Sequence, residues 1–142
     1  MTPDTIANWF LQKEAMPPKK LQKLVYYTYV WNLVINHSKL FDEPFGAWVH
    51  GPTLFSLFKK YKGIDLIPQI TSPLSSNLSL KTIDILNQVW TVYGQYNQYE
   101  LESIVHQEDP WLKARGQASP IENCYNVLKD KDVKKYYKPI AT

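Results

Sequence analysis

The sequence is nearly without cysteine and arginine. Cys124 is its one cysteine, so no disulfide can form within the chain, which fits a reducing compartment. Arg115 is the one arginine among 16 Lys and Arg residues, and the net charge is only +3. Proteins that bind nucleic acids usually carry a dense basic stripe, and lysine lacks the fork with which arginine contacts bases and phosphates. Nucleic acid is therefore not an expected partner.

Membrane and targeting signals are also missing. No window approaches the roughly 18 apolar residues that a membrane helix needs. The first residues include Asp4, Trp9 and Gln12 in place of the basic run and apolar block of a signal peptide. Glycine is scarce, with 5 residues, and none is spaced for a phosphate-binding loop. We therefore expect a cytoplasmic protein with no membrane contact.

Aromatic side chains are what the chain has in abundance. They make up 14% of it, with 10 Tyr and 5 Trp, beside 44% apolar and 20% charged residues. Tyr and Trp commonly lie where a core meets water, because each ring carries a polar atom that needs a partner. The length of 142 residues fits one domain, spanning 1–142, that can enclose a core.

Apolar periodicity and helix-breaking residues predict a mainly α fold. We expect a single compact domain of about seven helices, with at most a minor β-hairpin. The predicted helical segments are 3–14, 18–37, 53–62, 80–93, 97–107, 111–115, a segment that begins at Pro120, and 132–137. The other predicted segments are a packed loop or short strand at 47–49, a strand at 64–70 and a surface loop at 71–79.

Three of the predicted helix starts depend on capping signals. Ser79 is a plausible cap for the helix at 80–93. Asn97 with Glu100 has the spacing of a capping box, in which the cap residue and the residue three places on satisfy each other's backbone N–H groups. Ser119 with Glu122 is a second candidate, with proline at the first helical position.

Catalytic and metal-binding groups are hard to assemble from this sequence. Cys124 falls in the predicted helix that begins at Pro120, where we interpret it as a small core residue rather than a nucleophile. His37, His50 and His106 are far apart, and no His-x-x-x-His or Cys-x-x-Cys spacing occurs. We therefore assign no catalytic, cofactor-binding or metal-binding residue, and we expect a protein that is not an enzyme.

One local group does have the residue types of a metal site, namely His106, Glu108 and Asp109. The interpretation that we favour is structural. His106 would end a helix, where a cation suits the helix dipole, and the two acids would cap the next turn.

Three short motifs combine bulky aromatic residues with a turn former or a charge. They are Leu21–Tyr27, Ala47–Pro52, and His106–Trp111 followed by Ala114-Arg115. In the second motif, Gly51-Pro52 is expected to open the helix at residue 53 and to fix the direction of His50, whose contact we expect to be a loop carbonyl rather than a ligand. In the third, a helix would bring Arg115 onto the Trp111 ring, and we favour a structural role over an interface anchor.

In order and spacing these motifs resemble the Panacea antitoxin domain, the family of the SocA-type antitoxins and the phage-associated GepA-like proteins. The resemblance extends over roughly residues 3–137, and further matching stretches are Pro18-Lys19-Lys20, Leu40-Phe41, Val92-Tyr93-Gly94, Glu100-Leu101 and Tyr136-Tyr137. Thr53 departs from the family pattern, which usually has valine there. The signature residues, interpreted as fold determinants in preference to binding residues, are Leu21, Lys23, Leu24, Tyr26, Tyr27, Trp48, His50, Gly51, Pro52, His106, Pro110, Trp111 and Arg115.

The resemblance implies the antitoxin of a type II toxin–antitoxin system in a bacterium or prophage. Such a protein neutralises a cognate toxin encoded nearby, by direct protein–protein binding that covers the toxin's active site. Small alarmone synthetases and other translation-blocking toxins are among the partners implied. The alternative is a proteolytic adaptor that delivers the toxin to a protease. The identity of the toxin, the residues that contact it and the oligomeric state, a homo-oligomer included, stay open.

Overall fold

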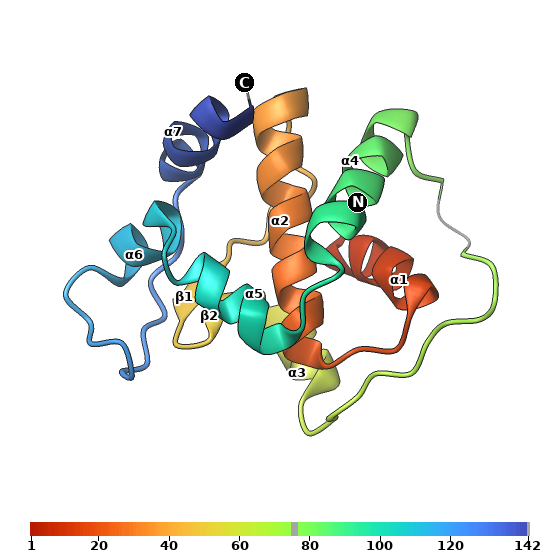
Figure 1. Ribbon diagram of the computed structural model, residues 1–142, viewed down its shortest axis with the longest axis horizontal. Coiled ribbons are helices and arrows are strands. Elements are labelled where there is room, and N and C mark those ends of the chain that lie inside the picture. Colours follow the sequence, from red (N-terminus) through yellow and green to blue (C-terminus); the bar gives the residue numbers. More distant parts are fainter. Residues whose placement is uncertain (75–76, 142) are drawn as a thin grey trace.

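Helix α2 (Pro18–Asn36) runs through the middle of the molecule in the computed structural model, which describes residues 1–74 and 77–141 (Figure 1). It begins after Pro17, and Pro18 occupies the first helical position, where its missing N–H costs nothing. It ends at His37, which takes the left-handed conformation with φ of 58°. The sequence of α2 is apolar on nearly every side, and the helix is correspondingly buried along most of its length.

The remaining elements surround α2. They are α1 (Pro3–Lys13), the strands β1 (Gly46–Trp48) and β2 (Gly51–Thr53), α3 (Phe55–Tyr61), α4 (Leu80–Tyr93), α5 (Gln98–Val105), α6 (Asp109–Arg115) and α7 (Asp130–Ala141). Helices α1, α3, α4, α5 and α7 all pack against α2, and α6 packs against α7 and β1. The described residues thus form a single, mainly α domain with seven helices and one two-stranded antiparallel hairpin, as predicted.

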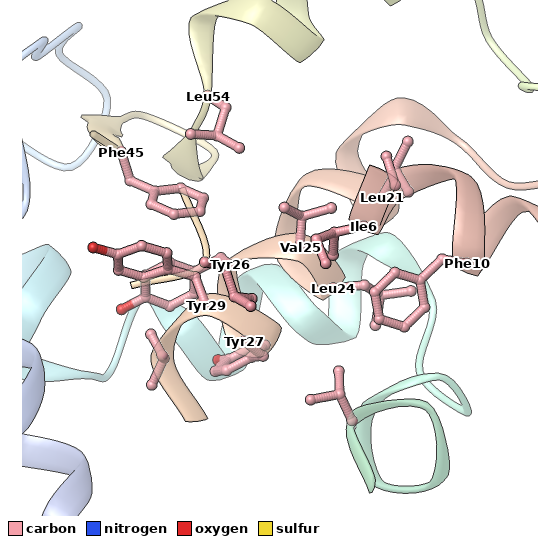
Figure 2. Close-up of a cluster of buried hydrophobic side chains, with 14 of the residues drawn as sticks. Ile6, Phe10, Leu21, Leu24, Val25, Tyr26, Tyr27, Tyr29, Phe45 and Leu54 are labelled. Carbon is pink, nitrogen blue, oxygen red and sulfur yellow. The ribbon is translucent and has the colours of Figure 1, made fainter. Parts of the chain in front are cut away.

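Core side chains pack against α2 near its start and again farther along the helix (Figure 2). Ile6 and Phe10 of α1 lie near the first turns of α2, and both are fully buried. Farther along, Phe45 meets Tyr26 and Tyr29 edge-on, with ring centroids 5.2 Å and 5.5 Å away. The buried tyrosines carry hydroxyl groups into the core, so each of those groups needs a hydrogen-bond partner.

Two of the three predicted caps are confirmed. The Ser79 hydroxyl accepts a hydrogen bond from the Thr82 N–H at 3.2 Å, so α4 starts as expected. Asn97 and Glu100 form the complete capping box at the start of α5, with bonds of 2.9 Å in both directions.

The predicted helix at Pro120 is wrong. Residues 126–128 instead lie beside β1, where the Ala47 N–H donates to the Asn126 carbonyl and the Leu128 N–H donates to the Phe45 carbonyl. These backbone bonds to a neighbouring strand compete with the bonds of a helix. Cys124 is therefore not helical, although it is 9% exposed and buried.

Two further boundaries also differ from prediction. The strand expected at 64–70 is reduced to one bridge between Ile67 and Met16, because Pro68 has no N–H with which to continue a ladder. Gly51-Pro52 does not open a helix but belongs to β2, where Pro52 pairs with Ala47. The helix begins later, at Phe55.

Helix α7 is longer than the 132–137 predicted, since Pro139 lies within its last turns without ending it. The loop predicted at 71–79 includes residues 75 and 76, which lie outside the described residues. Across residues 1–74 and 77–141, no helix combines the length and apolar character that would be needed to cross a membrane.

Candidate protein-interaction site

Three tyrosines of the fold converge on one carboxylate. Tyr27 and Tyr137 each donate a hydrogen bond of 2.7 Å to the same oxygen, Oε1 of Glu108. The hydroxyl groups of Tyr26 and Tyr137 are 3.1 Å apart, and since Tyr137 gives its single proton to Glu108, Tyr26 is the donor to Tyr137. Burial raises the pKa of Glu108, and the two tyrosine bonds partly oppose that rise. This network fastens α2 to α7 and to the junction of α5 and α6.

The sole arginine and its neighbouring tryptophan hold the hairpin. Trp111 donates its indole N–H to the Trp48 carbonyl at 2.8 Å, and Arg115 donates to the Ala47 carbonyl at 2.9 Å. The other side of the guanidinium binds the Ser119 and Glu122 carbonyls. Arg115 is 4% exposed and lies 4.8 Å from the centre of the Trp111 ring, which confirms the predicted cation–π contact.

In the third motif His106 takes the expected place, but its surroundings and the contacts of Glu108 differ from the expectation. His106 does end α5, but burial lowers its pKa, which disfavours the cationic form. Its ring stacks on Trp111 at 4.1 Å, and Nε2 has no hydrogen-bond partner among the described residues. Glu108 occupies the cap position of α6 without making a capping bond, because its carboxylate accepts from the tyrosines instead. Asp109 is the first residue of α6.

His50 contacts a carboxylate rather than the loop carbonyl expected. Its Nδ1 lies 2.8 Å from Oε1 of Glu102 in α5. The adjoining Gly51 has φ of 121°, a conformation that side chains rarely allow. A Cβ atom at residue 51 would lie 3.2 Å from Cγ1 of Val105 and 3.4 Å from Cε of Lys23. Glycine therefore lets the hairpin pass close to α5 and to the lysine of the first motif.

Lys23 is a charged residue enclosed by the fold. It is 2% exposed, and its ammonium donates to the Lys19 carbonyl at 3.2 Å. Burial lowers the pKa of Lys23 to about 8, while the negative charge of Glu102 acts in the opposite direction. The ammonium group is thus kept in an environment that does not favour its charge.

A cavity of about 500 Å³ lies beside Lys23. It is bounded by the first turns of α2, the β1–β2 hairpin, α3 and the segment 61–65. Trp48, Phe58 and Tyr61 contribute aromatic rings to its wall, and Lys19, Lys62 and Asp65 contribute charges.

Exposed aromatic rings continue from this cavity onto the surface. Phe55, Phe58 and Tyr125 are 59%, 39% and 66% exposed. They are joined through the half-buried Trp48, whose ring centroid is 4.9 Å from Phe58 and 5.4 Å from Tyr125, while Phe55 is 6.4 Å from Phe58. We call these four residues the aromatic face. Of the four, only Trp48 lies in one of the sequence motifs, and Phe55 and Phe58 have the spacing of a core-facing helix and give no other signal.

In the described part of the chain, no three His, Cys, Asp or Glu side chains lie close enough together to hold a metal ion. The signature residues instead fall into three settings: the tyrosine network, the contacts that hold the hairpin, and the wall of the cavity.

A family described as "Antitoxin SocA-like, Panacea domain" has a model that matches residues 21–112, which is more than half of the chain. No curated protein and no solved structure matches the chain.

Proposed function

This chain belongs to the antitoxin SocA-like, Panacea domain family, and from that membership we propose that it is the antitoxin of a type II toxin–antitoxin system. The family indicates a general antitoxin role. The specific proposal is that the protein acts in the cytoplasm, binds a cognate toxin encoded nearby and neutralises it by direct contact. It needs no catalytic residue for this function.

The observation that supports a binding surface is the aromatic face. Tyrosine, tryptophan and arginine supply most of the energetically important contacts at protein interfaces. Four connected aromatic rings, three of them at least 39% exposed, form an apolar surface of a kind that soluble proteins usually cover with a partner. We propose that the toxin contacts the protein here.

The remaining signature residues serve the scaffold in this proposal. The Glu108 network and the Arg115 contacts fix α2, α7 and the hairpin, so that Trp48 is presented in a defined position. The domain would extend beyond the matched residues, because α1 and α7 pack directly on α2. An interface of standard size, about 1,600 Å² in total, is enough to cover the active site of a toxin. A small alarmone synthetase, or another toxin that blocks translation, is the expected partner.

Co-expression with the product of the adjacent gene tests this proposal. We expect the neighbour to arrest growth alone and to be harmless beside the wild-type protein. Replacing Phe55 and Tyr125 together by alanine should weaken the protection, since both rings are largely exposed and their loss leaves the core intact. The matched control is Leu80→Ala, which removes an 81% exposed apolar side chain at the start of α4, at the opposite end of the molecule from α3 (Figure 1).

The outcomes separate the mechanisms. A neighbour that is harmless alone, or that stays toxic beside the wild-type protein, contradicts the antitoxin role. A toxin level that falls when the antitoxin is present, with protection lost in a protease-deficient strain, favours the proteolytic adaptor over occlusion.

A further inference from the structure

We propose that the cavity beside the aromatic face receives an acidic side chain of the toxin, whose carboxylate pairs with the ammonium group of Lys23. This inference depends on the proposed function and adds to it the chemistry of the contact. It assigns a binding role to a residue that the sequence pattern suggested was structural.

The ammonium group of Lys23 is incompletely paired. An ammonium group has three donors, and within the described residues this one makes a single hydrogen bond, to the Lys19 carbonyl. Among residues 1–74 and 77–141, no carboxylate lies within 4.0 Å of its nitrogen. The nearby acid, Glu102, is engaged at 2.8 Å by His50. The side chain is 2% exposed, and the cavity beside it is the side from which a further acceptor can approach its ammonium group.

The lining of the cavity has an excess of positive charge. Its lining residues include the cations Lys19, Lys23 and Lys62 and one anion, Asp65. His50 also lines the cavity, but its Nδ1 contacts the carboxylate of Glu102. The volume of about 500 Å³ accommodates a side chain with part of its backbone. The lining therefore complements a negatively charged segment rather than a basic or neutral one.

The aromatic face beside the cavity favours a protein as the source of that carboxylate. Trp48 and Phe58 belong both to the wall of the cavity and to the aromatic face, so a segment seated in the cavity continues onto the exposed rings. A small free anion would leave those rings uncovered. A protein surface with an Asp or Glu set among apolar residues fills both, and the toxin is the partner that supplies it.

The experiment compares two lysine-to-methionine variants for binding to the purified toxin. Lys23→Met keeps the volume of the side chain and removes the charge, and we expect the dissociation constant to rise at least about tenfold, because the toxin's carboxylate would be buried without a partner. The control is Lys62→Met, an exposed lysine of the same cavity, for which we expect less than about a fivefold change. The midpoint of thermal unfolding should be no lower for Lys23→Met than for the wild-type protein, since an underpaired buried charge has been removed.

The toxin provides the reciprocal measurement. Its Asp and Glu residues are changed singly to Asn and Gln, and one of these changes should weaken binding to the wild-type antitoxin about tenfold while having little further effect on Lys23→Met. The inference is overturned if Lys23→Met binds within about threefold of the wild type, or if no single carboxylate of the toxin matters. Failure of the wild-type protein to bind the toxin at all would instead contradict the proposed function, so the two failures are distinguishable.

Discussion

Lys20 and Lys23 lie about one turn apart on α2, and their two ammonium groups differ in how many hydrogen-bond partners they have. Lys20 is 7% exposed and binds the Glu14 carboxylate at 2.9 Å and the Gly94 carbonyl at 2.8 Å. Its ammonium also lies 5.5 Å from the centre of the Trp90 ring. Lys23 is 2% exposed and has the Lys19 carbonyl at 3.2 Å.

The completeness of hydrogen bonding distinguishes buried polar groups that stabilise the fold from those that do not. The bonds of Lys20 connect α2 to the ends of α1 and α4, so its charge contributes to packing these helices together. The same completeness holds around Glu108, where every tyrosine hydroxyl has a partner. Lys23 carries the cost of burial without those bonds, which is the expected state of a group that acts when a partner is bound.

The largest effect on stability is expected where the polar groups are completely paired, in the network around Glu108. Glu108→Leu removes the acceptor of two tyrosine hydroxyls and should lower the free energy of unfolding by about 3 kcal/mol. Glu108→Gln is the matched control. It keeps a carbonyl oxygen that can accept both bonds, so its loss should be about 1 kcal/mol or less.

Equilibrium unfolding in urea, followed by circular dichroism, measures both Glu108 variants. If leucine proves as well tolerated as glutamine, the tyrosine network does not stabilise the fold, and pairing no longer separates the two kinds of polar group.

A smaller loss is expected for Lys20→Met, about 2 kcal/mol. The change leaves the Gly94 carbonyl without its donor and removes the ring contact with Trp90, while the half-exposed Glu14 can return to water. The comparison is with Lys23→Met on the same helix, measured by the same urea titration. If the free energy of unfolding falls for Lys20→Met and does not fall for Lys23→Met, the contrast between the two lysines is confirmed. Equal losses for the two variants would contradict it.

Much of the fold followed from local signals in the sequence. The starts of α2, α4 and α5 were predicted because proline, serine and the Asn97–Glu100 pair act on backbone groups a few residues away. The hydrogen bonds of the capping box form within four residues, so they need no partner from a distant part of the chain.

Segments that depend on distant partners were not predictable in the same way. Ser119 and Glu122 have the spacing of a cap, yet their carbonyls are taken by Arg115, and the chain that follows pairs with β1. The candidate site shows the same limit. In the sequence Lys23 resembles any lysine of a helix, and only the structure shows that Gly51 packs against it. Phe55 has the spacing of a core residue, and only the structure shows that it is exposed.

The smallest expected effect is a pH dependence that belongs to Lys23 alone. Burial lowers its pKa to about 8, whereas an unfolded lysine titrates near 10.5. Below pH 8 both states hold the proton and the folded state bears the full cost of the buried charge. As the pH rises from 8 towards 10.5, the folded protein releases the proton before the unfolded chain does, so its stability increases.

Between pH 7.5 and 9 this linkage should raise the stability of the wild-type protein by about 1 kcal/mol relative to Lys23→Met. Urea midpoints at several pH values in that range, taken for both proteins, measure the difference. Subtraction cancels most of the titration that the two proteins share, since the neighbours of Lys23, which are Lys19, Glu102 and His106, are present in both. Parallel profiles would mean that the Lys23 ammonium is as well accommodated as that of Lys20. A gap that narrows as the pH rises means that the fold keeps an ammonium group it does not itself satisfy, which is the property that a carboxylate from the toxin would use.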